Sequence, residues 1–191
     1  DEIKRFKGKI TKTASKRKVA AFIQNIHHFR DAYLPPSEQI PAEKVAIFDE
    51  AQRAWTKEQT AKFMLKRHVP GWNMSEPEFL ISVMDRHQDW TVIICLIGGG
   101  QEIHTGEAGL LAWFDALRDH FPDWNVYVSP QISDVEYTHG KQLEHLFTGL
   151  RLYREPNLHL SVSLRSFRNE RVSAFVKSLL DENLPVAQQL Y

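Results

Sequence analysis

The segment Lys44-Val45-Ala46-Ile47-Phe48-Asp49-Glu50-Ala51-Gln52-Arg53 begins as an apolar run of strand length and ends in two adjacent acids and a glutamine. A central parallel strand, buried on both faces, has a continuous apolar sequence of this kind, and its carboxyl end lies at the crevice where ligands bind. Asp49 and Glu50 are therefore expected at that crevice, where one carboxylate can bind a metal ion and the next can orient a water molecule. Adjacent acids are also typical of a helix N-terminus, which favours negative charge, so this alternative stays open.

The pattern Asp-Glu-Ala-Gln resembles a Walker B motif, in the form known as motif II of the superfamily 1 helicases. The resemblance implies that Asp49 holds Mg²⁺ on the β- and γ-phosphates of ATP and that Glu50 orients the attacking water. It also implies that Gln52 lies within reach of the nucleotide.

A second apolar run, Thr91–Ile97, leads into Gly98-Gly99-Gly100-Gln101. Glycines allow positive φ and let the backbone approach a ligand closely, and Gln101 has the reach to hydrogen-bond a phosphate oxygen or its attacking water. The block resembles motif III, the γ-phosphate sensor. It differs from that motif because the aspartate after the first glycine is absent and the spacing from glycine to glutamine is one residue shorter. A glycine-rich turn between a strand and a helix is the alternative interpretation.

The alternating segment Leu158–Ser166 predicts a further strand, and the segment Val172–Leu180 predicts an amphipathic helix after it. This arrangement resembles motif IV, whose arginine reaches across the cleft between two RecA-like domains to the transferring phosphoryl group. Arg165 is the predicted arginine finger. Arg168 and Arg171 follow at spacings of three and are expected on the exposed side of the succeeding helix.

These blocks, together with the segments Phe22–Arg30 and Ser75–Phe79, resemble one family over nearly the whole chain. It is the bacterial DNA/RNA helicase domain family that is grouped with the Schlafen group 3 proteins. The resemblance implies an α/β fold, a RecA-like P-loop NTPase core with a parallel sheet flanked by helices. It implies an ATP-dependent DNA or RNA helicase or translocase with ATP and Mg²⁺ as cofactors and with single-stranded or duplex DNA or RNA as partner. Gly98, Gly99 and Gly100 would then lie beside the nucleotide, together with Asp49, which would bind the metal ion. Glu50, Gln52, Gln101 and Arg165 would form the catalytic set.

Two other functions stay open. The chain could be part of an ATPase that acts as a switch or scaffold and moves a fused domain without unwinding nucleic acid. It could also be a degenerate domain that is kept for binding, as the missing aspartate of motif III suggests. Stimulation of ATP hydrolysis by nucleic acid separates a motor from a switch.

A Walker A loop does not occur in the sequence. Gly8-Lys9 is the nearest candidate, but Ile3 stands in place of the first glycine and Ile10 in place of the hydroxyl that binds magnesium. We therefore expect residues 1–191 to be an internal part of a single RecA-like motor domain, without its first strand and P-loop. Residues 158–191 would begin the connection to a second RecA-like domain. The isolated chain is expected to bind ATP weakly and to hydrolyse none measurably.

Composition allows one proper core, because 42% of the 191 residues are hydrophobic. Lys plus Arg and Asp plus Glu both total 24, so the net charge gives no general attraction to nucleic acid or to an anionic membrane. The exception is residues 1–18, which include a tract of basic residues without an acid: Lys4, Arg5, Lys7, Lys9, Lys12, Lys16, Arg17 and Lys18. Lys16, Arg17 and Lys18 are candidate contacts to a phosphate backbone, and a solvated, flexible segment is the alternative.

Other single residues are weaker candidates. Trp72, in a loop beside Pro70 and Gly71, is the tryptophan most suited to base stacking. His104 follows the glycine-rich turn and could face the nucleotide, although a surface or capping role is also open. The nine histidines show no zinc-site spacing, and Cys95 is the single cysteine, which excludes an intrachain disulfide. The sequence contains neither a membrane-spanning run nor a signal-peptide pattern, and a cytoplasmic location is expected.

The remaining pattern predicts alternating helices and strands, and hence a parallel sheet with helical crossovers. A Pro-rich loop is expected at residues 34–41, and Ser75 with Glu78 forms a capping pattern at a helix start. The predicted helices cover residues 15–33, 56–67, 75–87, 107–121 and 141–150, and further strands cover 44–48, 91–97 and 125–129.

Overall fold

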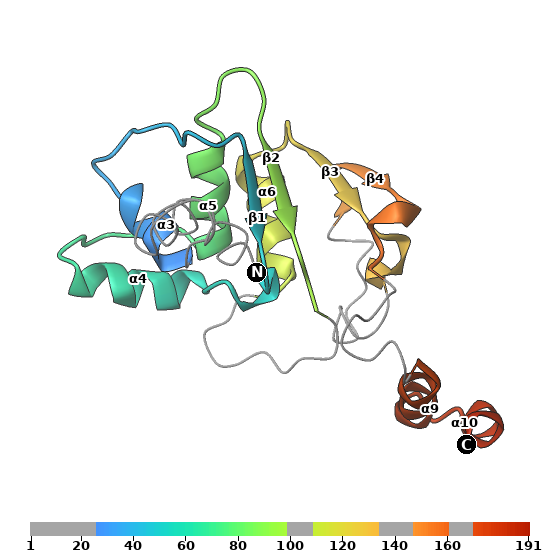
Figure 1. Ribbon diagram of the computed structural model, residues 1–191. Coiled ribbons are helices and arrows are strands. Elements are labelled where there is room, and N and C mark those ends of the chain that lie inside the picture. Colours follow the sequence, from blue (N-terminus) through green and yellow to red (C-terminus); the bar gives the residue numbers. More distant parts are fainter. Residues whose placement is uncertain (1–25, 99–108, 134–146, 161–169) are drawn as a thin grey trace, which may run out of the picture. The chain divides into compact units, whose positions relative to one another are not determined.

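The computed structural model describes residues 26–98, 109–133, 147–160 and 170–191 (Figure 1). Within these residues the protein is mixed α/β, with six α-helices and two sheets of two strands each, which confirms the predicted α/β class. The chain divides into two compact units, which are described separately. The first contains residues 1–124 and 135–151, and the second contains residues 125–134 and 152–191.

A parallel pair of strands forms the sheet of the first unit. The strands are β1 (Val45–Phe48) and β2 (Val92–Cys95), with Val45 opposite Val92 and Phe48 opposite Cys95. Parallel neighbours need a long crossover connection, and the chain between these strands contains two helices. The strands predicted at residues 44–48 and 91–97, and their parallel direction, are confirmed.

The described part of the first unit contains four α-helices: α3 (Ile26–Ala32), α4 (Lys57–Lys66), α5 (Glu76–Met84) and α6 (Leu111–His120). The hydroxyl of Thr56 caps α4 by accepting a hydrogen bond from the Gln59 amide. Ser75 and Glu78 form the predicted capping box at the start of α5. The helices predicted at 56–67, 75–87 and 107–121 are confirmed with shorter ends. Of the helices predicted at 15–33 and 141–150, most residues lie outside the described ranges.

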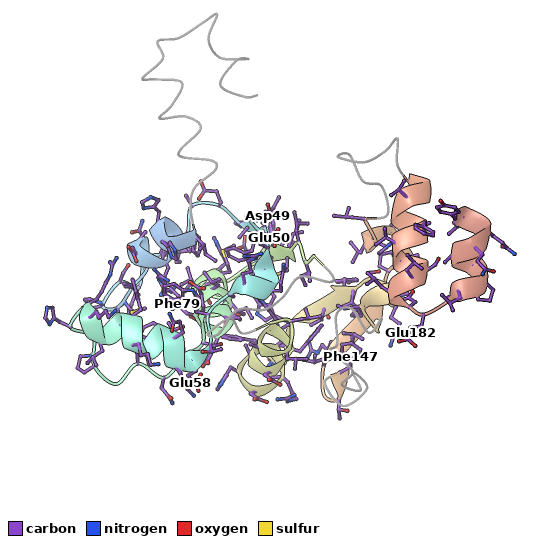
Figure 2. The ribbon with its side chains drawn as sticks, turned by 90° about the horizontal axis from the view of Figure 1, so that it is seen from below. Asp49, Glu50, Glu58, Phe79, Phe147 and Glu182 are labelled. Carbon is purple, nitrogen blue, oxygen red and sulfur yellow. The ribbon has the colours of Figure 1, made fainter. Side chains whose placement is uncertain are left out.

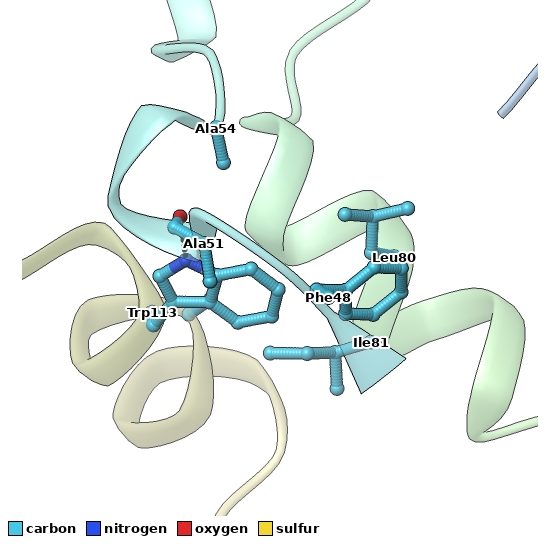
Figure 3. Packing of buried hydrophobic residues seen from close by; sticks show 7 residues of the cluster. Phe48, Ala51, Ala54, Leu80, Ile81 and Trp113 are labelled. Carbon is cyan, nitrogen blue, oxygen red and sulfur yellow. Dashed lines mark hydrogen bonds between the residues drawn. The ribbon is translucent and has the colours of Figure 1, made fainter. Parts of the chain in front are cut away.

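Apolar side chains from β1, α5 and α6 pack into one core on one face of the sheet (Figure 3). The aromatic rings of Phe48 and Trp113 lie 5.8 Å apart within it. Burying a large apolar side chain of this kind stabilises the fold by roughly 1.5–3 kcal/mol. The core consists of Phe48, Ala51, Ala54, Leu80, Ile81, Trp113 and Ala116.

The opposite face of the sheet is open in the described residues. Side chains alternate along a strand, so Ala46, Phe48, Ile93 and Cys95 face the core whereas their neighbours point outward. The expectation of strands buried on both faces is therefore wrong for this part of the chain. The outward residues are Val45, Ile47, Val92 and Ile94, each more than 40% exposed.

A buried ion pair attaches α3 to the start of α5. Arg30 Nη1 donates to Glu76 Oε1 at 3.0 Å, and the two side chains are 1% and 2% exposed. The guanidinium also lies over the rings of Trp55 and Phe63, at 4.7 and 4.0 Å from their centroids. Glu76 Oε2 accepts the backbone amide of Trp55 at 2.9 Å. The pair therefore fixes the chain just after the segment that ends at Arg53.

The second unit contains the strands β3 (Asn125–Val128) and most of β4 (Arg151–Arg154), which pair with each other, and the helices α9 (Glu170–Leu180) and α10 (Leu184–Leu190). The strand predicted at 125–129 and the amphipathic helix predicted at 172–180 are confirmed by β3 and α9. β4 and α10 were not predicted. Among the helices that the structure describes, none combines the length and the apolar character that a bilayer crossing requires.

One predicted strand begins too early. Leu158 lies in the short 3-10 helix η3 (Pro156–Leu158) and is not extended. Pro156 restricts the backbone at the start of this turn, and the Glu155 carboxylate accepts the Asn157 amide at 3.0 Å, which caps it. Residues 161–169, which hold the rest of the predicted strand, lie outside the described part of the chain.

Candidate functional site

The carboxyl ends of β1 and β2 meet at one edge of the parallel sheet. Phe48 and Cys95 are opposite each other there, so Asp49 and Glu50 leave the sheet beside Leu96 and Gly98. Two backbone hydrogen bonds continue the pairing past the strands, from the Leu96 amide to Phe48 at 2.9 Å and from the Ala51 amide to Leu96 at 3.0 Å. The two segments predicted to contact the nucleotide are thus brought together, as far as Gly98.

Glu50 occupies an unusual backbone conformation. Its φ of 53° and ψ of 41° are left-handed, which is uncommon for a residue other than glycine and costs of order 1–3 kcal/mol. Its amide donates to Asp49 Oδ1 at 3.0 Å, and the short 3-10 helix η1 (Ala51–Arg53) begins after it. Figure 2 shows Asp49 and Glu50 next to each other at this turn. The Glu50 side chain makes no capping hydrogen bond to η1, so the alternative of a helix-capping role for this carboxylate is not observed.

Gln52 links the acidic turn to the end of β2. Its side chain is buried, and its Nε2 donates to Glu50 Oε2 at 2.7 Å. Its Oε1 accepts the backbone amide of Gly98 at 3.3 Å, and its own carbonyl accepts the Gly109 amide at 3.0 Å. One buried side chain therefore binds both Glu50 and the glycine segment.

The charges around Glu50 are mixed. Arg53 Nε lies 3.4 Å from Glu50 Oε2, and both side chains are about half exposed. Asp49 is exposed as well, so this carboxylate is accessible to a ligand from solvent. The turn presents two carboxylates with a cation beside the second.

Two further contacts hold this turn in place, and the sequence patterns did not reveal them. The indole Nε1 of Trp113 donates to the Ala51 carbonyl at 2.8 Å within the core. Glu76 binds the Trp55 amide, as described above. A buried Trp N–H and a buried carboxylate both need partners, which is the one signal that could have pointed to them.

Cys95 ends β2 next to the site, and its side chain packs against the core. Burial raises the pKa of its thiol to about 12, so the group stays protonated at neutral pH.

Several predicted site residues lie outside the described ranges: Gly99, Gly100, Gln101, Arg165, Lys16, Arg17, Lys18 and His104. Trp72 is described and is half-buried. Its Nε1 donates to the Met74 carbonyl at 2.8 Å, and its ring lies edge-on to Phe79 at 5.2 Å. Stacking of a base on Trp72 stays a prediction.

The donor set fits a magnesium ion that arrives with a nucleotide. Within the described ranges, no group of three or more His, Cys, Asp or Glu side chains gathers as metal ligands. Mg²⁺ is commonly held by one or two carboxylates together with substrate phosphates and water. The exposed carboxylate of Asp49, at the end of a parallel strand, is suited to that kind of binding.

Comparison with known proteins gave one result. The family model described as "Schlafen group 3, DNA/RNA helicase domain" matches residues 1–191, which is the whole chain. No match was found among curated proteins, and none among solved structures.

Proposed function

The chain belongs to the Schlafen group 3 DNA/RNA helicase domain family, and we propose that it forms the ATP-hydrolysing part of a DNA or RNA helicase or translocase. The observation that most supports this proposal is the side chain of Gln52, which binds both Glu50 and the Gly98 amide. In the proposed site, this link would join the acid that orients the water to the segment that contacts the γ-phosphate. The proposed fold is the RecA-like P-loop core, of which β1 and β2 would be two central strands.

The acidic turn would perform two tasks. MgATP, when bound, supplies the phosphoryl group that is transferred to water. Asp49 would bind the magnesium ion with its exposed carboxylate. Glu50 would orient the attacking water and accept its proton, and we assign this task to Oε1 because Gln52 and Arg53 bind Oε2.

The remaining roles follow from the family resemblance. Gln101 would sense the γ-phosphate, and Arg165 would neutralise charge on the transferring phosphoryl group. Gly98, Gly99 and Gly100 would let the backbone approach the phosphates. We propose that a Walker A loop elsewhere in the same polypeptide, and a second RecA-like domain, complete the site.

The test is the turnover number for ATP of a polypeptide that contains this chain and a Walker A loop. Glu50→Gln should lower kcat by about a hundredfold or more, because a general base contributes that much. Glu182→Gln is the matched control, since Glu182 also has a left-handed backbone, with φ of 55°, but lies outside the site. Equal kcat for wild type and Glu50→Gln would remove Glu50 from the mechanism, and absence of turnover in both would favour a degenerate binding domain.

A further inference from the structure

Two tyrosines of neighbouring strands lie stacked on an exposed surface of the second unit. The rings of Tyr127 in β3 and Tyr153 in β4 are 4.9 Å apart, and their planes differ by 20°. Their exposed fractions are 58% and 47%. β3 and β4 run side by side (Figure 1) and form a two-stranded ribbon. Val128, which follows Tyr127 in β3, is buried and so lies on the other face.

Pairing alone does not explain this exposure. A cross-strand aromatic pair stabilises a sheet, but the ring surface that faces away from the partner stays in water. Every nucleobase has a flat π-face, and an exposed aromatic ring on a strand is how many proteins hold an unpaired base. The two rings are already parallel, so a base can extend the stack with little loss of side-chain freedom.

A cationic side chain lies on the face of the β3–β4 ribbon that presents the tyrosines. Arg151 precedes Tyr153 by two residues in β4, which places both side chains on one side of the strand. Arg151 Nη2 binds the Asp123 carboxylate at 2.6 Å, with side chains 55% and 86% exposed. An exposed ion pair of this kind contributes little to stability, so the guanidinium can exchange Asp123 for a phosphate.

We propose that Tyr127, Tyr153 and Arg151 form a binding surface for single-stranded nucleic acid, with bases stacked on the tyrosines and a phosphate on the arginine. A single strand fits this chemistry better than a duplex, whose bases are already stacked on each other. The inference rests on the proposed function, because it takes nucleic acid as the partner. It adds a site that is separate from the residues assigned to ATP.

The experiment measures binding of a fluorescent oligothymidylate and the matching oligouridylate, each of about 15 nucleotides, by anisotropy with the chain of residues 1–191. Tyr127→Ile and Tyr153→Ile remove the flat rings but keep high strand propensity, so the ribbon is retained. The double variant should weaken binding by at least about tenfold, whereas Tyr127→Phe with Tyr153→Phe should bind as the wild type does. Tyr191→Ile is the control, because Tyr191 is 95% exposed and lies outside the ribbon.

A strand of the same length without bases separates stacking from charge. The isoleucine variants should bind this abasic strand as tightly as the wild type does, because only base contacts are lost. Arg151→Gln should weaken binding of both oligonucleotides, with and without bases. It should also reduce the slope of log affinity against log salt by about one. Arg67→Gln is its control, since Arg67 also pairs with an aspartate, Asp31, at 2.7 Å but lies outside the ribbon.

Two results would overturn the inference, and only one of them would also overturn the proposed function. Wild-type binding that the double isoleucine variant retains would reject the tyrosine surface and leave the proposed function intact. Absence of any wild-type binding to either strand would reject both. Photo-crosslinking of a bromouridine strand gives an independent check, because the expected adducts are on Tyr127 or Tyr153, and adducts confined to other residues would contradict the site.

Discussion

Gln52 is the residue whose side chain connects the two segments that we propose contact the nucleotide. A glutamine side chain has one acceptor oxygen and two donor hydrogens, and here the oxygen binds the Gly98 amide while the nitrogen binds Glu50. Because the side chain is only 5% exposed, water does not readily replace these partners. A displacement at either segment is therefore transmitted to the other through one side chain.

Replacing Gln52 with methionine tests this link. Methionine has a similar shape but cannot hydrogen-bond the Gly98 amide or Glu50, so partly buried polar groups lose their partners. We expect the free energy of unfolding of the chain to fall by about 1–3 kcal/mol, measured from urea denaturation. Gln59→Met, on the half-buried surface of α4, is the control and should change it by less than about 1 kcal/mol. Equal denaturation midpoints for Gln52→Met and wild type would show that the link has no energetic weight.

At the scale of elements, the α3–α5 contact depends on the buried pair of Arg30 and Glu76. Three helices and the segment at Trp55 meet at these two side chains, because Arg30 packs on Trp55 and on Phe63 of α4, and Glu76 binds the Trp55 amide. Removing one member of a buried pair leaves an uncompensated charge in a poorly hydrated place. The position of the turn that holds Gln52 then depends on a contact outside the site.

Glu76→Gln should therefore destabilise the chain by about 3–5 kcal/mol in urea denaturation. Arg30→Met combined with Glu76→Leu removes both charges and should recover most of that loss, because an apolar pair of similar size tolerates burial. Asp115→Asn is the control: it removes one partner of the exposed Arg118 pair at 2.8 Å and should cost less than about 1 kcal/mol. A Glu76→Gln variant as stable as Asp115→Asn would contradict the importance of the buried pair.

The sequence predicted those features whose cause is local. The capping box of Ser75 and Glu78 spans three residues, and the strand before Asp49 is visible as a continuous apolar run, so both could be found. The partners of Gln52 and Glu76 could not, because Gly98 and Arg30 are each 46 residues away along the chain. The tyrosine pair was missed for a different reason: β4 is short and was not recognised as a strand. The 3-10 turn at Leu158 was missed because an alternating pattern outweighed the proline before it.

For the molecule as a whole, the family match covers more of the chain than the described candidate residues for ATP do. The match covers residues 1–191, whereas the described candidate residues for ATP, Asp49, Glu50, Gln52 and Gly98, all lie in the first unit. Arg165, the predicted finger, lies outside the described residues. The chain as a whole has no net charge, so attraction to nucleic acid has to come from local groups such as Arg151.

Stimulation of ATP hydrolysis by single-stranded DNA or RNA tests the proposed motor most directly. The measurement uses a polypeptide with this chain and a Walker A loop, and the chain of residues 1–191 alone should show no measurable hydrolysis. The complete polypeptide should hydrolyse ATP much faster with a single strand than without it. Arg165→Ala should abolish that stimulation, since an arginine finger contributes about 10³–10⁵ to kcat. Hydrolysis at the same rate with and without nucleic acid would contradict a motor and leave a nucleotide-driven switch.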